Sequence, residues 1–113
     1  MRLTIIGCGD AFGSGGRFNT CFMVQGSSST LLLDCGASTP VALKLRNVDL
    51  NAIDGIVLSH LHGDHFGALP FFMLESQFHL QRTRPLTVVG RPGTRQGVLE
   101  GMEVFFPRSS KNK

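Results

Sequence analysis

The sequence of 113 residues contains no tryptophan and no tyrosine, and it has only three cysteines. It also lacks any run of about 18 apolar residues, which excludes a membrane-spanning helix. The apolar run at residues 3–6 is too short for a signal peptide and is typical of a strand. Cys8, Cys21 and Cys35 form no Cys-x-x-Cys pair, and each lies in or beside an apolar run. We therefore expect reduced, buried thiols in a cytoplasmic protein.

The rest of the composition is that of one globular domain over residues 1–113. Apolar residues make up 42% of the chain and charged residues 17%, which excludes a disordered protein. Eleven basic residues against eight acidic ones give a formal net charge of +3. This charge permits an anionic substrate without requiring one.

Short apolar runs alternate with glycine-rich breaks and predict five strands, at residues 2–7, 20–25, 30–34, 53–58 and 86–89. The short connection between the second and third strands predicts an antiparallel hairpin. Both of these strands are nearly continuously apolar, so we expect both of their faces to be covered.

Three helices are predicted after the third strand. The first follows Ser38 and Thr39, either of which can cap it, and runs to about Asn47. The second covers residues 69–80, and the third is capped by Thr94. A group of strands followed by strand–helix alternation indicates a mixed α/β layered fold.

Three of the four histidines fall within six residues, directly after the fourth strand, in the segment Ser-His-Leu-His-Gly-Asp-His at residues 59–65. His60 and His62 point the same way at the end of an extended segment. Gly63 lets the chain turn sharply, which brings Asp64 and His65 in from another direction. Imidazole nitrogens and a carboxylate oxygen suit Zn²⁺, and also Mn²⁺ or Fe²⁺. The alternative is a solvated polar turn, but such turns seldom hold three histidines at this spacing.

The pattern His-x-His-x-Asp-His after a buried strand resembles the signature of the metallo-beta-lactamase superfamily. The segment Leu-Leu-Asp-Cys-Gly at residues 32–36 resembles the Asp-x-Gly segment of the same superfamily. Within the superfamily, residues 59–70 and 85–90 resemble the ribonuclease Z branch. The resemblance covers almost the whole chain.

This resemblance implies a four-layer αββα sandwich, of which the chain forms the N-terminal αβ half, a mixed sheet with helices on one side. It implies two zinc ions, with His60 and His62 as ligands of the first and Asp64 and His65 as ligands of the second. A hydroxide that bridges the ions would attack a phosphodiester or an ester, RNA among them. Asp64 would also orient this nucleophile or handle its proton, and Asp34 would accept a hydrogen bond that fixes the loop.

Members of the superfamily carry three further ligands downstream, a His, a bridging Asp and a second His. His79 matches none of these positions, and we expect it to be an ordinary surface or groove histidine. The chain is thus expected to be the N-terminal half of a metal-dependent hydrolase. The alternative is a catalytically incomplete metal-binding fragment or interaction half. Its apolar strands would need another chain, such as a missing C-terminal half, or self-association to cover their second face.

Three further features give weaker signals. The glycine-rich loop at residues 7–16 lacks the following helix that a dinucleotide-binding fingerprint requires. The resemblance places this loop beside the metal site, and a purely structural turn is the alternative. Ser59 lies in no Gly-x-Ser-x-Gly elbow, which disfavours a serine hydrolase. Residues 107–113 form a polar, basic tail that we expect to have no core to join.

Four arginines, Arg82, Arg84, Arg91 and Arg95, lie close together in the sequence with no acidic residue among them. Such a cluster can bind phosphates or simply face the solvent. No aromatic residues interleave with these arginines, so stacking on single-stranded bases is unsupported.

Overall fold

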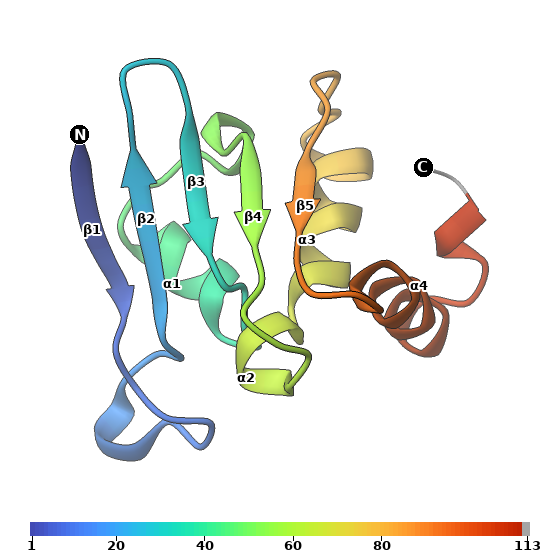
Figure 1. Ribbon diagram of the computed structural model, residues 1–113, viewed down its shortest axis with the longest axis horizontal. Helices are drawn as coiled ribbons and strands as arrows, with labels where there is room; N and C mark the ends of the chain where they lie inside the picture. Colours follow the sequence, from blue (N-terminus) through green and yellow to red (C-terminus); the bar gives the residue numbers. More distant parts are fainter. Residues whose placement is uncertain (112–113) are drawn as a thin grey trace.

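A computed structural model describes residues 1–111 and contains a five-stranded sheet with helices against one face (Figure 1). The strands lie side by side in sequence order: β1 (Arg2–Gly7), β2 (Cys21–Gln25), β3 (Thr30–Leu33), β4 (Gly55–Val57) and β5 (Thr87–Val89). The first three strands pair antiparallel, and β4 and β5 extend the sheet in parallel. The predicted mixed sheet and the β2–β3 hairpin are therefore confirmed.

The main helices are α1 (Thr39–Leu45), α3 (Leu69–Leu74) and α4 (Thr94–Phe105), and one short helix, α2 (Gly63–Phe66), follows β4. A π-helical turn, η3 (Glu75–His79), continues α3, so the helix predicted over residues 69–80 changes its hydrogen-bonding pattern partway. The remaining single turns are η1 (Ser14–Gly16), η2 (Leu50–Ala52) and η4 (Ser109–Lys111). No helix within residues 1–111 is long and apolar enough to cross a membrane.

The hydrophobic core lies between the sheet and the helices α1, α3 and α4 (Figure 1). Leu32 contributes from β3 and Ile56 from β4, and Leu43, Phe72 and Met102 contribute one fully buried side chain from each helix. Alternation of side chains along a strand sends every second residue to this core and the others to the opposite face.

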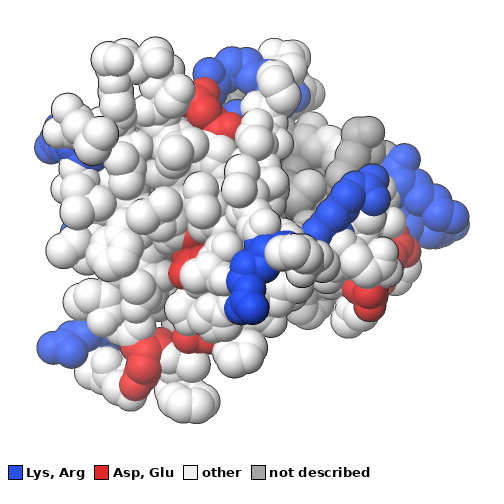
Figure 2. Space-filling view, viewed as in Figure 1, with Lys and Arg blue, Asp and Glu red and all other residues white. Residues whose placement is uncertain are grey.

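That opposite face, here called the open face, is apolar across all five strands. Its apolar members pair across the sheet, with Gly55 and Thr87 in the same register, and are Leu3, Ile5, Phe22, Val24, Leu31, Leu33, Val57 and Val89. Leu3 is 63% exposed and Val89 is 52% exposed. Over the middle of the sheet this face is almost without charged side chains (Figure 2). The expectation that both faces of β2 and β3 are covered is wrong within residues 1–111, because all three main helices pack on one side.

The two predicted helix caps are also wrong, because the hydroxyl groups of Ser38 and Thr94 do not cap their helices. Ser38 occupies the N-cap position of α1, but its hydroxyl accepts a hydrogen bond from the backbone N–H of Asn19 at 2.8 Å instead of capping. Thr94 is the first residue of α4, and its hydroxyl donates to the carbonyl of Arg91 at 2.6 Å. In each case another backbone partner competes successfully with the helix end for the hydroxyl.

Two of the three cysteines are buried as predicted, and the third is not. Burial raises the pKa of the Cys21 thiol to about 12 and raises the pKa of Cys35 as well. Cys8 is exposed, contrary to expectation, because β1 ends at Gly7 and the chain there leaves the sheet. The Cys21 thiol donates to the carbonyl of Asp34 at 3.3 Å, which links β2 to the segment that follows β3.

The tail predicted at residues 107–113 does join the fold over its described part. Ser109 is buried, and its hydroxyl donates to the carbonyl of Met102 at 3.1 Å. The Glu103 carboxylate accepts hydrogen bonds from the backbone N–H groups of Arg108 and Ser110. These contacts fold η4 back onto α4, and residues 112–113 lie outside the described part of the chain.

Candidate metal centre

Residues 59–65, here called the His loop, begin where β4 ends at the carboxyl edge of the parallel part of the sheet. His62 keeps extended backbone angles, and the helical turn α2 begins at the next residue. The imidazole rings of His60 and His62 lie 4.6 Å apart between centroids, and those of His60 and His65 lie 4.1 Å apart. The structure thus brings the three predicted histidines into one cluster.

Asp34 forms the base of this cluster. Its backbone lies in the left-handed region, with φ of 72°, a conformation that Asp and Asn tolerate better than most residues. Its Oδ2 atom accepts a hydrogen bond from His65 Nδ1 at 2.8 Å, and its Oδ1 atom accepts one from the backbone N–H of Ser59 at 2.7 Å. One carboxylate therefore holds both ends of the His loop.

The hydrogen bonds around Asp34 suit one tautomer of His60 and of His65. An ionised carboxylate only accepts, so His65 carries its proton on Nδ1. The Ser59 hydroxyl lies 2.8 Å from Asp34 Oδ2 and 3.0 Å from His60 Nδ1. When this hydroxyl donates to Asp34, it accepts from the Nδ1–H group of His60. With a proton on Nδ1, each imidazole would offer Nε2 to a metal ion, which for His65 would replace the 3.1 Å contact between Nε2 and Asp64 Oδ2.

The backbone of residues 35–37 supports the His loop from below. Cys35 donates its N–H to the carbonyl of His65 at 2.8 Å, and Ala37 donates to that of Gly63 at 3.2 Å. A Cβ atom at Gly36 would lie 2.0 Å from the carbonyl oxygen of Asp64. The close approach therefore occurs at Gly36. Gly63, from which we expected a sharp turn, has no positive φ and has open space where a Cβ would be.

The donor set fits a metal ion by its chemistry and by one distance. His65 Nε2 and Asp64 Oδ2 lie 3.1 Å apart. Because zinc bonds to these atoms measure about 2.0–2.2 Å, two ligand atoms of one ion lie about 3 Å apart. Within residues 1–111 no three His, Cys, Asp or Glu side chains already form a metal-binding group. The fit to a metal ion therefore rests on the types of donor and on this one pair of atoms.

Asp64 also lines a cleft of about 480 Å³. Its walls include Ala11 from the glycine-rich loop, Gly63 beside Asp64, and the aromatic rings of Phe71 and Phe105. The glycine-rich loop thus borders a residue of the His loop. This neighbourhood makes the glycine-rich loop part of the surroundings of the candidate site.

Asn19 fixes the glycine-rich loop in this place, and nothing in the sequence pattern indicated it. The residue is buried at 5% exposure. Its side-chain amide donates to the carbonyl of Asp10 at 2.9 Å, and its Oδ1 atom accepts from the backbone N–H of Ser38 at 3.1 Å. The only sequence signal for this role is an amide side chain shortly before an apolar strand. If such a side chain is buried, it needs hydrogen-bond partners, and backbone groups of nearby loops can supply them.

The four clustered arginines separate into two pairs. Arg82 donates to the carbonyl of Ile53 at 2.6 Å, and Arg84 pairs with Asp54 at 2.8 Å, so both brace the loop before β4. Arg91 and Arg95 are exposed, and within residues 1–111 neither pairs with a carboxylate. His79, predicted to be a surface or groove histidine, is likewise exposed at the end of η3.

Comparison with solved structures identifies the class of fold. The chain matches human tRNase Z, short form, with a TM-score of 0.77 and 30% identity over 93% of this chain and 40% of that one. It matches the metallo-beta-lactamase fold protein YhfI from Bacillus subtilis with a TM-score of 0.70 and 24% identity, over 83% of this chain and 38% of that one. The chain therefore has the metallo-beta-lactamase fold, represented by its N-terminal part.

Sequence comparison narrows this class. Ribonuclease Z of Lachnoclostridium phytofermentans is 37% identical over 92 residues, which are 81% of this chain and 30% of that protein. The chain belongs to the family described as anti-Pycsar protein Apyc1, whose model matches residues 1–93. It spans about a third of the length of the curated relatives it matches. The predicted likeness to ribonuclease Z within the metallo-beta-lactamase superfamily is thus confirmed.

Proposed function

We propose that this chain supplies one half of the metal site of a hydrolase that acts on a phosphodiester or an ester. One observation carries the proposal. Asp34 accepts hydrogen bonds from His65 directly and from Ser59, which in turn contacts His60. Such a network orients imidazoles for a metal ion and is unneeded in a solvated turn.

In this proposal His60 and His62 are ligands of one Zn²⁺ ion, and Asp64 and His65 are ligands of a second. Mn²⁺ and Fe²⁺ are alternatives with the same ligand preferences. Bound there, two cations would acidify a water molecule to a nucleophile and stabilise the charge that develops on the substrate oxygens. Asp64 would orient that nucleophile or accept its proton, while Asp34 keeps the protons of His60 and His65 on their Nδ1 atoms.

The site requires ligands beyond these four. We propose that a C-terminal half, supplied by further chain or by another molecule, adds them and also covers the open face. Without it, self-association of the open face is the alternative, and the chain would then be a catalytically incomplete metal-binding fragment or interaction half. We further propose one domain over residues 1–113 that acts in the cytoplasm.

The relatives favour RNA as the first substrate to test, because their names are ribonuclease Z and tRNase Z. A second candidate function follows from the family match over residues 1–93, which carries the name anti-Pycsar. Cells that carry Pycsar, with and without expression of the chain and of its Asp64→Ala variant, distinguish this candidate. An anti-Pycsar effect that requires Asp64 supports it, and the absence of any effect of the wild-type chain contradicts it.

The metal site itself is tested by equilibrium dialysis against Zn²⁺ followed by elemental analysis. We expect the wild-type chain to retain at most one tightly bound ion and the His60→Ala/His62→Ala variant to retain less. His79→Ala is the matched control, because it removes an exposed histidine outside the cluster. Equal metal content in all three proteins would contradict the proposal.

A further inference from the structure

Arg91 lies next to the His loop although 31 positions separate it from His60 in the sequence. The strands β4 and β5 are parallel neighbours, with Val57 opposite Val89, and Leu58 donates its N–H to the carbonyl of Val89 at 2.8 Å. The segments that leave these two strands therefore start side by side at the same edge of the sheet. His60 and Arg91 line a common small cavity of about 170 Å³.

The backbone that carries Arg91 is held in place from within its own loop. The carbonyl of Arg91 accepts hydrogen bonds from both the N–H group and the hydroxyl of Thr94, at 3.0 and 2.6 Å. The hydroxyl of Thr94 also packs against Gly90, where a Cβ would come within 2.4 Å of it. Pro92 follows, and Gly93 takes a φ of 93°. A well-fixed backbone reduces the ordering that its side chain needs on binding.

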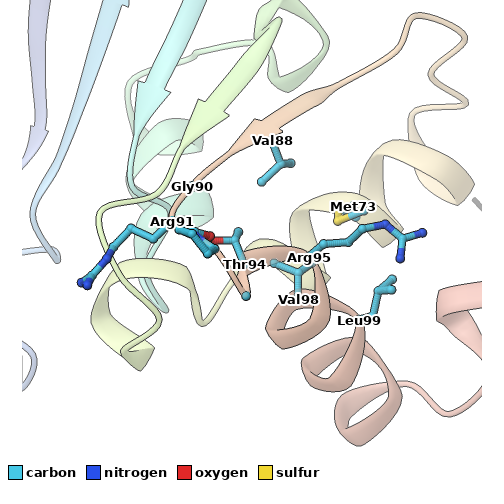
Figure 3. A pocket seen from close by; sticks show the side chains of 10 residues that line it. Met73, Val88, Gly90, Arg91, Thr94, Arg95, Val98 and Leu99 are labelled. Atoms are coloured by element: carbon cyan, nitrogen blue, oxygen red, sulfur yellow. The ribbon is translucent and has the colours of Figure 1, made fainter.

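The guanidinium of Arg91 itself is available. It is exposed, and within residues 1–111 no carboxylate pairs with it. Its side chain points away from the apolar cavity formed by Met73, Val88 and Val98, whereas Arg95 points in the opposite direction (Figure 3). The lining of the small cavity that Arg91 shares with His60 contains no acidic residue. This arrangement leaves the exposed guanidinium of Arg91 beside the candidate metal ligand His60.

We propose that Arg91 binds the phosphate group of the substrate beside the His loop. Its guanidinium would donate two parallel hydrogen bonds to non-bridging phosphate oxygens, an arrangement that a planar fork makes and a lysine does not. The inference rests on the proposed function, because it needs a metal ion near His60. It adds a residue of this chain that would hold the phosphate of such a substrate against the metal site.

The test uses dimethyl phosphate, a stable phosphodiester, titrated calorimetrically into the Zn²⁺-loaded chain. We expect Arg91→Ala to weaken its binding about tenfold, the effect of one lost charge-assisted contact, and Arg91→Lys to lose part of that affinity. Arg95→Ala is the matched control, because it removes an exposed arginine four residues away that pairs with no carboxylate within residues 1–111. We expect its affinity to stay within about twofold of wild type.

The outcomes separate the two proposals. If the wild-type chain takes up no Zn²⁺ in the equilibrium dialysis, the proposed function fails, and the role of Arg91 fails with it. If Zn²⁺ binds but Arg91→Ala and Arg95→Ala weaken phosphate binding equally, the effect comes from the net positive charge. That result would contradict a specific contact between Arg91 and the phosphate. Zinc binding without any phosphate binding would overturn only the role of Arg91. A thermal unfolding curve for each variant checks that the exposed substitutions leave the fold intact.

Discussion

Gly36 lies directly against the backbone of Asp64, so closely that a Cβ atom at position 36 would sit 2.0 Å from the Asp64 carbonyl oxygen. Because both partners are backbone, the contact cannot be relieved by a side-chain rotation. We expect Gly36→Ala to lower the free energy of unfolding by about 1–3 kcal/mol through overpacking. Chemical denaturation of the metal-free chain measures this change.

Gly63→Ala is the matched control for this substitution. Gly63 lies in the same His loop and begins the helical turn α2, and no atom lies within 4 Å of the place that a Cβ would take. We expect the free energy of unfolding to be unchanged or to rise by up to about 1 kcal/mol, since alanine has a higher helix propensity than glycine. Equal destabilisation by both substitutions would contradict the assignment of the close approach to Gly36.

The second prediction concerns Asp34 as a positioning residue for the His loop. Asn at this position keeps the shape and tolerates the φ of 72°, but it removes the charge that orients His65 and Ser59. We expect Asp34→Asn to weaken Zn²⁺ binding about 10- to 100-fold. Asp49→Asn is the control, because Asp49 caps η2 and Asn caps equally well. Unchanged zinc affinity in Asp34→Asn would show that the network does not orient the ligands.

The sequence predicted the elements of this site better than the contacts within it. The strand before His60 and the clustering of the three histidines follow from local patterns, since an apolar run forms the strand and the motif follows it directly. The partners of hydroxyl and amide groups depend on segments far away in the sequence. Ser38 bonds to Asn19 instead of capping α1, and no local pattern predicts that exchange.

Contacts between segments that are far apart in the sequence also decide the different roles of the arginines and of the glycines. Arg82 and Arg84 brace backbone and a carboxylate near β4, while Arg91 pairs with no carboxylate within residues 1–111, although the sequence presents them as one cluster. Gly36 and Gly63 look alike in sequence, yet of these two only the first faces another segment of backbone. Tertiary packing, which a single sequence does not display, decides which member of such a set has a structural task.

The third prediction concerns pH and the end of the described chain. Hydrogen bonds from the Ser110 hydroxyl, then from the backbone N–H groups of Arg108 and Ser110, lower the pKa of Glu103 to about 2 from its ordinary value of 4.5. A depressed folded-state pKa stabilises the fold above pH 4.5, and this contribution is lost as the pH falls towards 2. We expect η4 to detach from α4 in that range.

Nuclear magnetic resonance of the Arg108 and Ser110 amides follows this transition. Glu103→Gln should shift both signals already at pH 7, because the amide replaces a charged acceptor of three hydrogen bonds. Glu100→Gln, on the same helix, removes a carboxylate that accepts from Gln96 and should leave both signals unchanged. Signals that stay constant in the wild-type chain from about pH 5 to pH 2 would refute the prediction.

The fourth prediction concerns the open face. Leu3 is 63% and Ile5 is 52% exposed, and each side chain gains about 1.5–3 kcal/mol when it is fully buried. We expect the isolated chain to sediment as a dimer or larger species and Leu3→Ser/Ile5→Ser to dissociate it at least about tenfold more readily. Val41→Ser/Leu45→Ser is the control, because these residues are similarly exposed but lie on α1. A wild-type chain that stays monomeric at high concentration would contradict self-association.

The last prediction separates a half-site from a complete one through turnover of bis(p-nitrophenyl) phosphate. Residues 1–113 offer two side chains to each ion of the proposed pair, so the second ion is under-coordinated and the nucleophile is poorly placed. Misplacing a nucleophile by about 1 Å costs on the order of a hundredfold in rate. We therefore expect little or no turnover by residues 1–113 alone. A chain extended by a downstream half with His, Asp and His ligands should gain Zn²⁺-dependent turnover that Asp64→Ala abolishes. If residues 1–113 alone turn over the diester, and Asp64→Ala abolishes that activity, the half-site suffices, and the need for a second half is refuted while the hydrolase assignment stands.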